Sequence, residues 1–177
     1  MSTRRTFIAT GTALVAGTAG CLGILEDDSE DRQELYADAL DAYGDGETAF
    51  DNAMEDFERG EALFRDDSYS DAERYFRDAE RGLDSAVDSF TDVRSVLREL
   101  DEMESVLGDA QDIVEDSWEA AISFSSSAQF HRQAAEMAPY SQIGAQAQFD
   151  AGQQTIREEG YSRTVVSEIE LMGEFSE

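Results

Sequence analysis

Lysine is absent from this sequence, and cysteine, proline and histidine each occur once. A single cysteine cannot form an intramolecular disulfide, and one cysteine with one histidine cannot supply the ligands of a structural zinc site. No basic stripe is present to neutralise phosphates, which argues against a nucleic-acid-binding protein. The sequence has no run of about 20 apolar residues, the length that a membrane-spanning helix needs. We expect no cofactor, because the chain carries neither a haem-attachment motif nor a glycine-rich phosphate loop.

Negative charge is what the 177-residue chain has in excess, with 41 acidic residues against 13 arginines and a formal charge of −28. An aromatic content of 10% argues against a disordered acidic tail, since such tails lack aromatic residues. A folded chain this acidic repels itself in dilute salt, whereas a Debye length of about 3 Å at 1 M salt screens most of that repulsion. With only one asparagine, Asn52, the composition resembles that of proteins from salt-saturated archaeal cells.

Residues 1–20 have the layout of an export signal: a positive front, a short apolar stretch and then small residues. Arg4 and Arg5 are the only charges in this segment, and two apolar residues, Phe7 and Ile8, follow them. The arrangement resembles the twin-arginine export motif, and that resemblance implies export of an already folded protein. The apolar stretch is too short for a membrane-spanning helix.

Thr18, Ala19, Gly20 and Cys21 resemble a lipobox, in which the cysteine receives a lipid and becomes the mature N-terminus. The bacterial form of this motif usually has leucine where Thr18 stands. Two alternatives remain open, namely cleavage near Gly20 without a lipid and an uncleaved signal that acts as the anchor. The lipobox reading predicts that a lipid on Cys21 holds the protein at the membrane.

Residues 21–30 are expected to form a lipidated tether, and residues 31–177 an α-helical domain. A helix over about 28–65 is predicted from aromatic residues that recur every seven positions: Tyr36, Tyr43, Phe50, Phe57 and Phe64. Residues 66–68 form a turn, and Ser70 with Glu73 has the pattern of a capping box. A second helix follows with its own seam, which comprises Tyr69, Phe76, Leu83, Phe90 and Leu97 at one heptad position and Ala72, Ala79, Ala86, Val93 and Leu100 at the other. Large residues opposite alanines predict close antiparallel packing of the two helices.

Three further elements complete the predicted fold. We expect a break near Gly108 and a helix over about 110–137, with one long continuous helix as the alternative. A helix over about 141–158 follows Pro139 and uses a set of apolar positions: Ile143, Ala147, Phe149, Ala151 and Ile156. Residues 161–175 form a short last element, predicted as a helix despite its β-branched residues. The fold class is all-α, an antiparallel bundle of four or five helices with a long first hairpin.

Part of the hairpin resembles a tetratricopeptide repeat. The resemblance covers residues 53–84 and rests on five positions at the spacings of that repeat: Gly60, Tyr69, Ala72, Phe76 and Ala79. The chain departs from the pattern at Asp56 and Asp84, and solenoids need about three repeats whereas one is present here. The resemblance implies a surface that binds peptides or protein partners. An antiparallel hairpin that needs small residues at its contact explains the same positions equally well.

Little of the sequence points to chemistry. His131 lacks partner residues for a catalytic or metal role and is expected to be a partly exposed structural residue. Residues 41–52 begin like a calcium loop but have Tyr43 and Asn52 where acidic ligands belong. Residues 123–127 are rich in serine, but no general base stands beside them in the sequence.

These observations predict a non-catalytic lipoprotein on the extracytoplasmic face of the membrane, held by a lipid on Cys21. Its expected role is that of an interaction or accessory module with a protein partner. The alternative is a helical bundle that binds a small ligand outside the cytoplasm. Converging polar groups in a cavity would favour the alternative, whereas an apolar groove along the hairpin would favour the interaction module.

Overall fold

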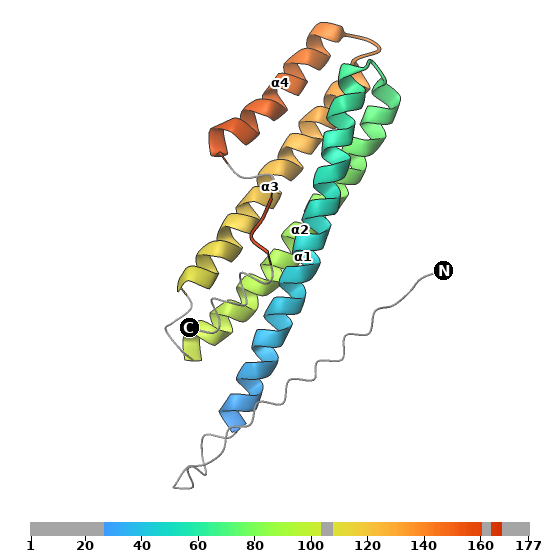
Figure 1. Cartoon of the computed structure of the whole chain (residues 1–177). Helices are drawn as coiled ribbons and strands as arrows, with labels where there is room; N and C mark the ends of the chain where they lie inside the picture. The colour runs from blue at the N-terminus through green and yellow to red at the C-terminus, as the bar shows by residue number, and fades with distance from the viewer. Residues whose placement is uncertain (1–26, 104–107, 161–163, 168–177) are drawn as a thin grey trace, which may run out of the picture.

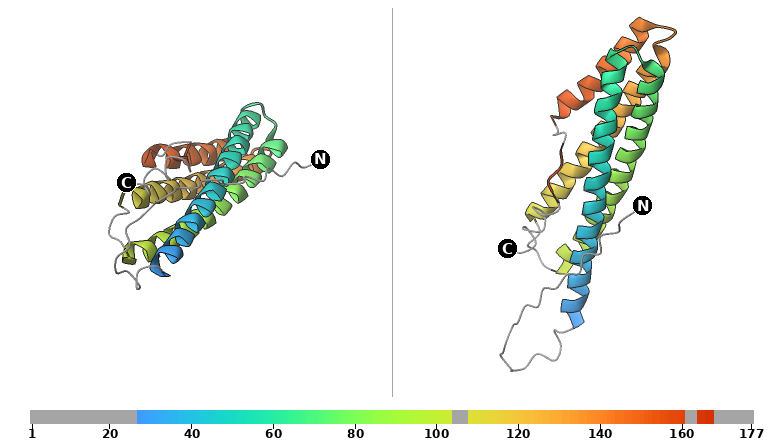
Figure 2. Two further views of the ribbon diagram at one scale, coloured as in Figure 1. Left: turned by 60° about the horizontal axis from the view of Figure 1, so that its bottom comes forward. Right: turned by 45° about the vertical axis from the view of Figure 1, so that its right-hand side comes forward.

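The computed structural model describes residues 27–103, 108–160 and 164–167. These residues form four helices: α1 (Asp27–Arg65), α2 (Tyr69–Met103), α3 (Gly108–Met137) and α4 (Gln142–Glu159). α1 and α2 form a long antiparallel hairpin, α3 packs along α2, and the shorter α4 folds back against α3 (Figures 1 and 2). The predicted all-α bundle is confirmed. α1 begins at Asp27, so the end of the predicted tether over 21–30 is helical, while residues 1–26 lie outside the described residues.

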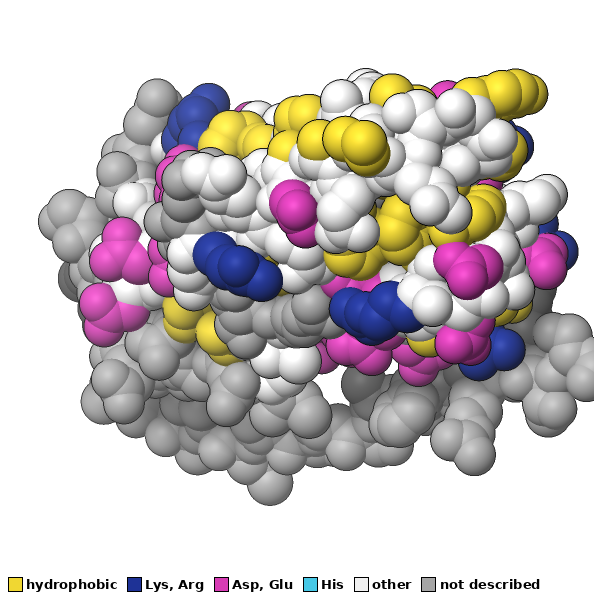
Figure 3. Space-filling view, turned by 90° about the horizontal axis from the view of Figure 1, so that it is seen from above, with side chains coloured by type: hydrophobic (Ala, Val, Ile, Leu, Met, Phe, Trp, Pro, Cys, Tyr) yellow, Lys and Arg dark blue, Asp and Glu magenta, His cyan; other side chains and the backbone are white. Residues whose placement is uncertain are grey.

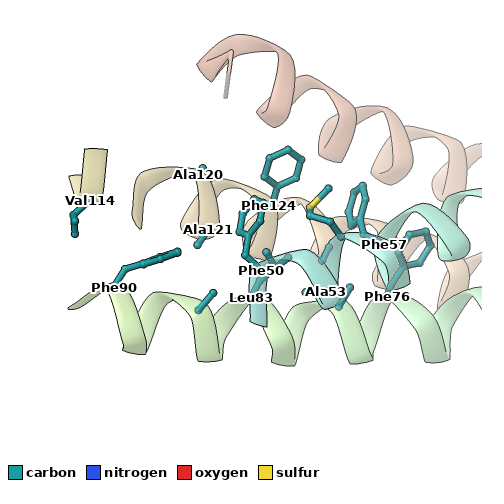
Figure 4. Packing of buried hydrophobic residues seen from close by; sticks show 14 of the residues in the cluster. Phe50, Ala53, Phe57, Phe76, Leu83, Phe90, Val114, Ala120, Ala121 and Phe124 are labelled. Atoms are coloured by element: carbon teal, nitrogen blue, oxygen red, sulfur yellow. The ribbon is translucent and has the colours of Figure 1, made fainter. Parts of the chain in front are cut away.

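The heptad seams build the core, as the sequence predicts. Apart from Tyr69, which is half-buried, every seam residue of α2 is buried, and on α1 the buried seam residues are Tyr43, Phe50, Phe57 and Phe64. Phe124 of α3 inserts between them, with ring centroids 5.9 Å from Phe50 and 6.1 Å from Phe57 (Figure 4). The contact face of the hairpin is therefore covered by a third helix of the same chain.

Glycines on α1 allow the two hairpin helices to approach each other closely. A Cβ atom at Gly46 would lie 2.6 Å from the ring of Phe90, and one at Gly60 would lie 2.7 Å from the ring of Phe76. The two contacts are separated by the same number of residues on each antiparallel helix, so both follow one heptad register. Glycine at position 46, which lowers helix propensity, is thus explained by the ring that packs over it.

The turn between α1 and α2 closes on Asp67, which adopts a left-handed conformation with φ of 58°. The backbone N–H of Ser68 donates to Leu63 O at 2.9 Å, and that of Asp67 donates to Phe64 O at 3.2 Å, as in a Schellman cap. α2 then begins at Tyr69. The predicted capping box at Ser70 is wrong, because Ser70 is the second residue of α2, whereas a capping residue precedes the helix.

The remaining elements confirm the predicted break and correct the apolar face of α4. α2 ends at Met103 and α3 begins at Gly108, so the continuous-helix alternative is wrong. The side chain of Ser141 caps α4 by accepting from the Gly144 N–H, and Gly160 ends the helix with φ of 72°. Ala145 and Phe149 face the core, whereas Ile143 and Ala147, which we predicted to be core residues, are exposed.

The predicted helix over residues 161–175 is also incorrect in the part that the structure describes. Residues 164–167 are not helical. They lie against the bundle, where the Tyr43 hydroxyl donates to Val166 O at 2.8 Å and Val165 packs on the core. Residues 161–163 and 168–177 lie outside the described residues.

Candidate functional site

His131 lies on α3 where all four helices meet. Its ring contacts Phe57 of α1, Phe76 of α2 and Phe149 of α4, at centroid distances of 5.0, 5.2 and 4.4 Å. The side chain has no exposed surface. The expectation of a partly exposed histidine is wrong, because α4 covers this face of α3.

Hydrogen bonds around the ring assign its proton to Nδ1. This atom lies 2.7 Å from Ser127 O, and a carbonyl oxygen can only accept. Nε2 lies 3.1 Å from Nε2 of Gln153 and therefore accepts from that amide group. The same amide nitrogen donates to Oε1 of Glu61, a buried carboxylate. One amide of α4 thus satisfies acceptors on α3 and α1 at once.

Ser127, His131 and Glu61 form an arrangement that looks like a catalytic triad. Ser127 Oγ lies 3.2 Å from His131 Nδ1, and His131 Nε2 lies 4.0 Å from Oε1 of Glu61. An imidazole ring therefore lies beside the serine run, and sequence reasoning missed it although Ser127 and His131 are four residues apart on one helix. However, Ser127 and His131 are fully buried, and the serine hydroxyl donates to Gly152 O at 2.9 Å. Since Nδ1 carries its own proton, the ring cannot deprotonate this serine.

The plentiful carboxylates do not converge on a metal site in the part of the chain that the structure describes. The segment that begins like a calcium loop, residues 41–52, lies within the continuous helix α1. Across the hairpin, carboxylates face each other instead: burial raises the pKa of Asp56, and Asp78 of α2 and Glu55 raise it further. Like charges therefore meet where α1 and α2 pack.

The exposed large hydrophobic side chains of the described residues all lie at the turn between α3 and α4. Met137 is 37% exposed, Tyr140 91% and Ile143 87%. This turn lies at the end of the bundle opposite the start of α1 (Figure 1). Residues 137–149 contain no Asp, Glu, Lys or Arg, although 31% of the whole chain is charged. Figure 3 views this end of the bundle and shows hydrophobic side chains gathered on it.

A groove adjoins these side chains, between the turn that links α1 to α2 and the start of α4. Phe64, Tyr69 and Ala145 line its apolar part, and Asp67, Gln142 and Gln146 its polar part. The Tyr69 hydroxyl donates to Asp67, and this hydrogen bond, with smaller effects of burial and of the Asp67 charge, raises the pKa of Tyr69. We call the exposed side chains and this groove together the apolar end.

A second groove lies between α2 and α3, lined by Arg94, Leu97, Arg98, Gln111 and Glu115. Arg94 Nε lies 2.7 Å from Oε2 of Glu115, and its guanidinium carbon lies 4.0 Å from the centre of the Trp118 ring. The charge of Arg94 is thus already paired within the protein.

The residues predicted from sequence fall into two groups. Gly60, Ala72, Phe76 and Ala79, four of the tetratricopeptide-like positions, are buried between the helices, and the fifth, Tyr69, lines the groove of the apolar end. The hairpin thus presents only Tyr69 of these five positions to solvent. The signal and lipobox residues lie outside the described residues.

Comparison of the chain with known protein families, curated proteins and solved structures finds no match. Within the described residues, no helix is both long and apolar enough to cross a membrane.

Proposed function

We propose that this protein is a non-catalytic interaction module, exported by the twin-arginine route and held at the outer face of the cytoplasmic membrane by a lipid on Cys21. The apolar end is the surface that meets its protein partner. The observation that carries this proposal is the grouping of exposed Met137, Tyr140 and Ile143 within an uncharged stretch at one end of a strongly acidic bundle. Contiguous exposed apolar surface is a mark of interaction sites.

The shape of the bundle suits a spacer. α1 has 39 residues, so at 1.5 Å per residue it extends about 58 Å. The start of α1, which follows Cys21 by six residues in the sequence, lies at the end of the bundle remote from the apolar end (Figure 1). A lipid at Cys21 would therefore leave the apolar end far from the membrane surface. Anionic lipid headgroups would also repel the acidic helices that flank the apolar end, and this repulsion favours a position of the bundle away from the membrane surface.

Photo-crosslinking on intact cells tests this proposal. A benzoyl-phenylalanine residue is introduced at Tyr140, and in a control at Glu58, which is exposed on the outer face of α1. We expect a discrete crosslinked product from position 140 that is absent or much weaker from position 58. Equal labelling at the two positions, or no product at position 140, would contradict an interaction surface at the apolar end.

A second candidate function is the binding of a small ligand in the groove between α2 and α3. The convergence of Arg98, Gln111 and the paired Arg94 and Glu115 over Leu97 favours it. Ligand-induced thermal stabilisation that is lost in Arg98→Gln but kept in Arg59→Gln would support this role. Arg59 is exposed on α1, away from the groove.

A further inference from the structure

We propose that the groove between α2 and α3 binds a small carboxylate and that Arg98 is the residue that recognises it. This inference rests on the second candidate function and names the class of its ligand. It follows from the way in which polar side chains pair between the two helices and from the charge of the groove.

Polar side chains of α2 and α3 pair in one antiparallel register. The Trp118 indole N–H donates to Thr91 Oγ1 at 3.1 Å. Arg94 Nε lies 2.7 Å from Oε2 of Glu115. Three residues forward along α2 are thus matched by three residues back along α3, as antiparallel packing requires. The same register defines which two residues meet about one helical turn further along.

Arg98 and Gln111 are the residues that this register brings together next. Arg98 follows Arg94 by four residues, Gln111 precedes Glu115 by four, and both line the groove. α3 therefore supplies a carboxylate to the first arginine but only a neutral amide to the second. Among the residues whose side chains the structure describes, none forms an ion pair with Arg98. The charge of this exposed guanidinium is available to an external anion.

The charge of the groove favours a monoanion. Arg94 and Glu115 neutralise each other, so the lining residues keep one unpaired positive charge, that of Arg98. A carboxylate is singly charged at neutral pH, and its two oxygens match the fork of a guanidinium. The amide of Gln111 can donate a further hydrogen bond. A phosphate, with a charge of about −2, would bring a second negative charge that no lining residue balances.

The size of the groove limits the rest of the ligand. Its volume is about 210 Å³, below the roughly 300–1,000 Å³ of sites for drug-sized molecules. Buried Leu97 supplies apolar lining, so a short alkyl group can accompany the carboxylate. The Trp118 ring and Glu115 hold Arg94 in place, which reduces the entropy lost on binding. We therefore expect a small carboxylic acid with a short apolar group.

NMR titration of the purified full-length chain tests this inference. The probe is potassium butyrate in 1 M KCl, where the repulsion from the acidic surface is largely screened, and the control is butyramide, the uncharged amide of the same shape. We expect saturable shifts of the Nε–Hε signals of Arg94 and Arg98 with butyrate and about tenfold or more weaker binding of butyramide. Equal affinity for the two compounds would overturn the inference and leave the candidate ligand-binding role standing. Shifts that do not saturate with butyrate would also overturn it.

Substitutions at the groove provide the second measurement. Gln111→Glu gives Arg98 the carboxylate that α3 lacks, and we expect it to weaken butyrate binding about tenfold or more. Gln142→Glu, which adds the same charge at the apolar end, and Arg59→Gln on α1 should bind butyrate as the wild type does. Unchanged helical circular dichroism would show that the variants are folded. Butyrate binding that survives both Gln111→Glu and Arg98→Gln would overturn the inference. Photo-crosslinking at position 140 tests the proposed function independently of this outcome.

Discussion

A single methyl group added at Gly152 tests how tightly α4 is held over His131. Gly152 lies on α4, and its carbonyl accepts from the Ser127 hydroxyl. A Cβ atom at this position would lie 2.5 Å from Nδ1 of His131 and 2.6 Å from its Cε1. Contacts below about 3 Å require movement, and the rings of Phe57, Phe76 and Phe149 surround the imidazole and restrict it.

Two effects of Gly152→Ala oppose each other. Alanine is favoured over glycine in a helix interior by about 1 kcal/mol. Overpacking of a filled core costs about 1–3 kcal/mol, and the enclosed ring places this site at the upper end of that range. We therefore expect a net loss of about 2 kcal/mol in the free energy of unfolding. For a domain of this size, that loss lowers the melting temperature by about 4–8 °C.

Urea and thermal unfolding in concentrated KCl, followed by circular dichroism, measure this change. Gly108→Ala is the matched control, because a Cβ atom at Gly108 meets nothing within 4 Å. We expect the control to leave the melting temperature unchanged or slightly higher. If Gly152→Ala stabilised the protein as much as Gly108→Ala, the packing of α4 against His131 described above would be wrong.

Three further predictions concern the core, the charge and the signal. Phe57→Ala should lower the free energy of unfolding by about 3–5 kcal/mol, because Phe57 is fully buried against three rings. Glu58→Ala, on the exposed face of the same helix, should change it little. Comparable losses for the two variants in unfolding experiments would contradict the assigned core. The raised pKa of Asp56 means that its charged form destabilises the folded state at neutral pH and that this cost is relieved as the pH falls through the folded-state pKa. Asp56→Asn should therefore raise the melting temperature at low salt and by less in about 3 M KCl, because salt screens the repulsion from Asp78 and Glu55 but not the cost of burial. A larger increase in concentrated salt than at low salt, or no increase at either, would refute this account. Replacement of Arg4 and Arg5 by lysine should stop export although the charge is kept, and fractionation that finds the variant at the cell surface at normal levels would exclude the twin-arginine route.

Sequence periodicity predicted the long hairpin well because burial follows helical geometry directly. Aromatic residues spaced by seven on both helices have one face to bury, and the structure buries it. α4 was harder to predict because its apolar positions do not define a single face. Ala145 and Phe149 are four residues apart and point inward, whereas Ile143 and Ala147 lie about 200° around the helix from Ala145 and face solvent.

The environment of His131 could not be predicted from the sequence. Its burial depends on where α4 folds back, because Gln153 of α4 donates to Nε2 of the ring and also donates to Glu61 of α1. The close relation to Ser127 was available in the sequence as a four-residue spacing on one helix. The apolar end was also missed, because an uncharged stretch reads as core until the structure shows which of its side chains remain exposed.

Labelling with a membrane-impermeant maleimide on intact cells tests most directly whether the module is held outside the membrane by its N-terminal lipid. The wild-type chain has one cysteine, Cys21, whose thiol would be consumed by lipid attachment, whereas Glu58→Cys adds an exposed thiol on α1. We predict that both proteins are recovered with the membrane and that only Glu58→Cys is labelled on intact cells. Labelling of the wild-type chain, or labelling of Glu58→Cys only after the cells are lysed, would contradict the account.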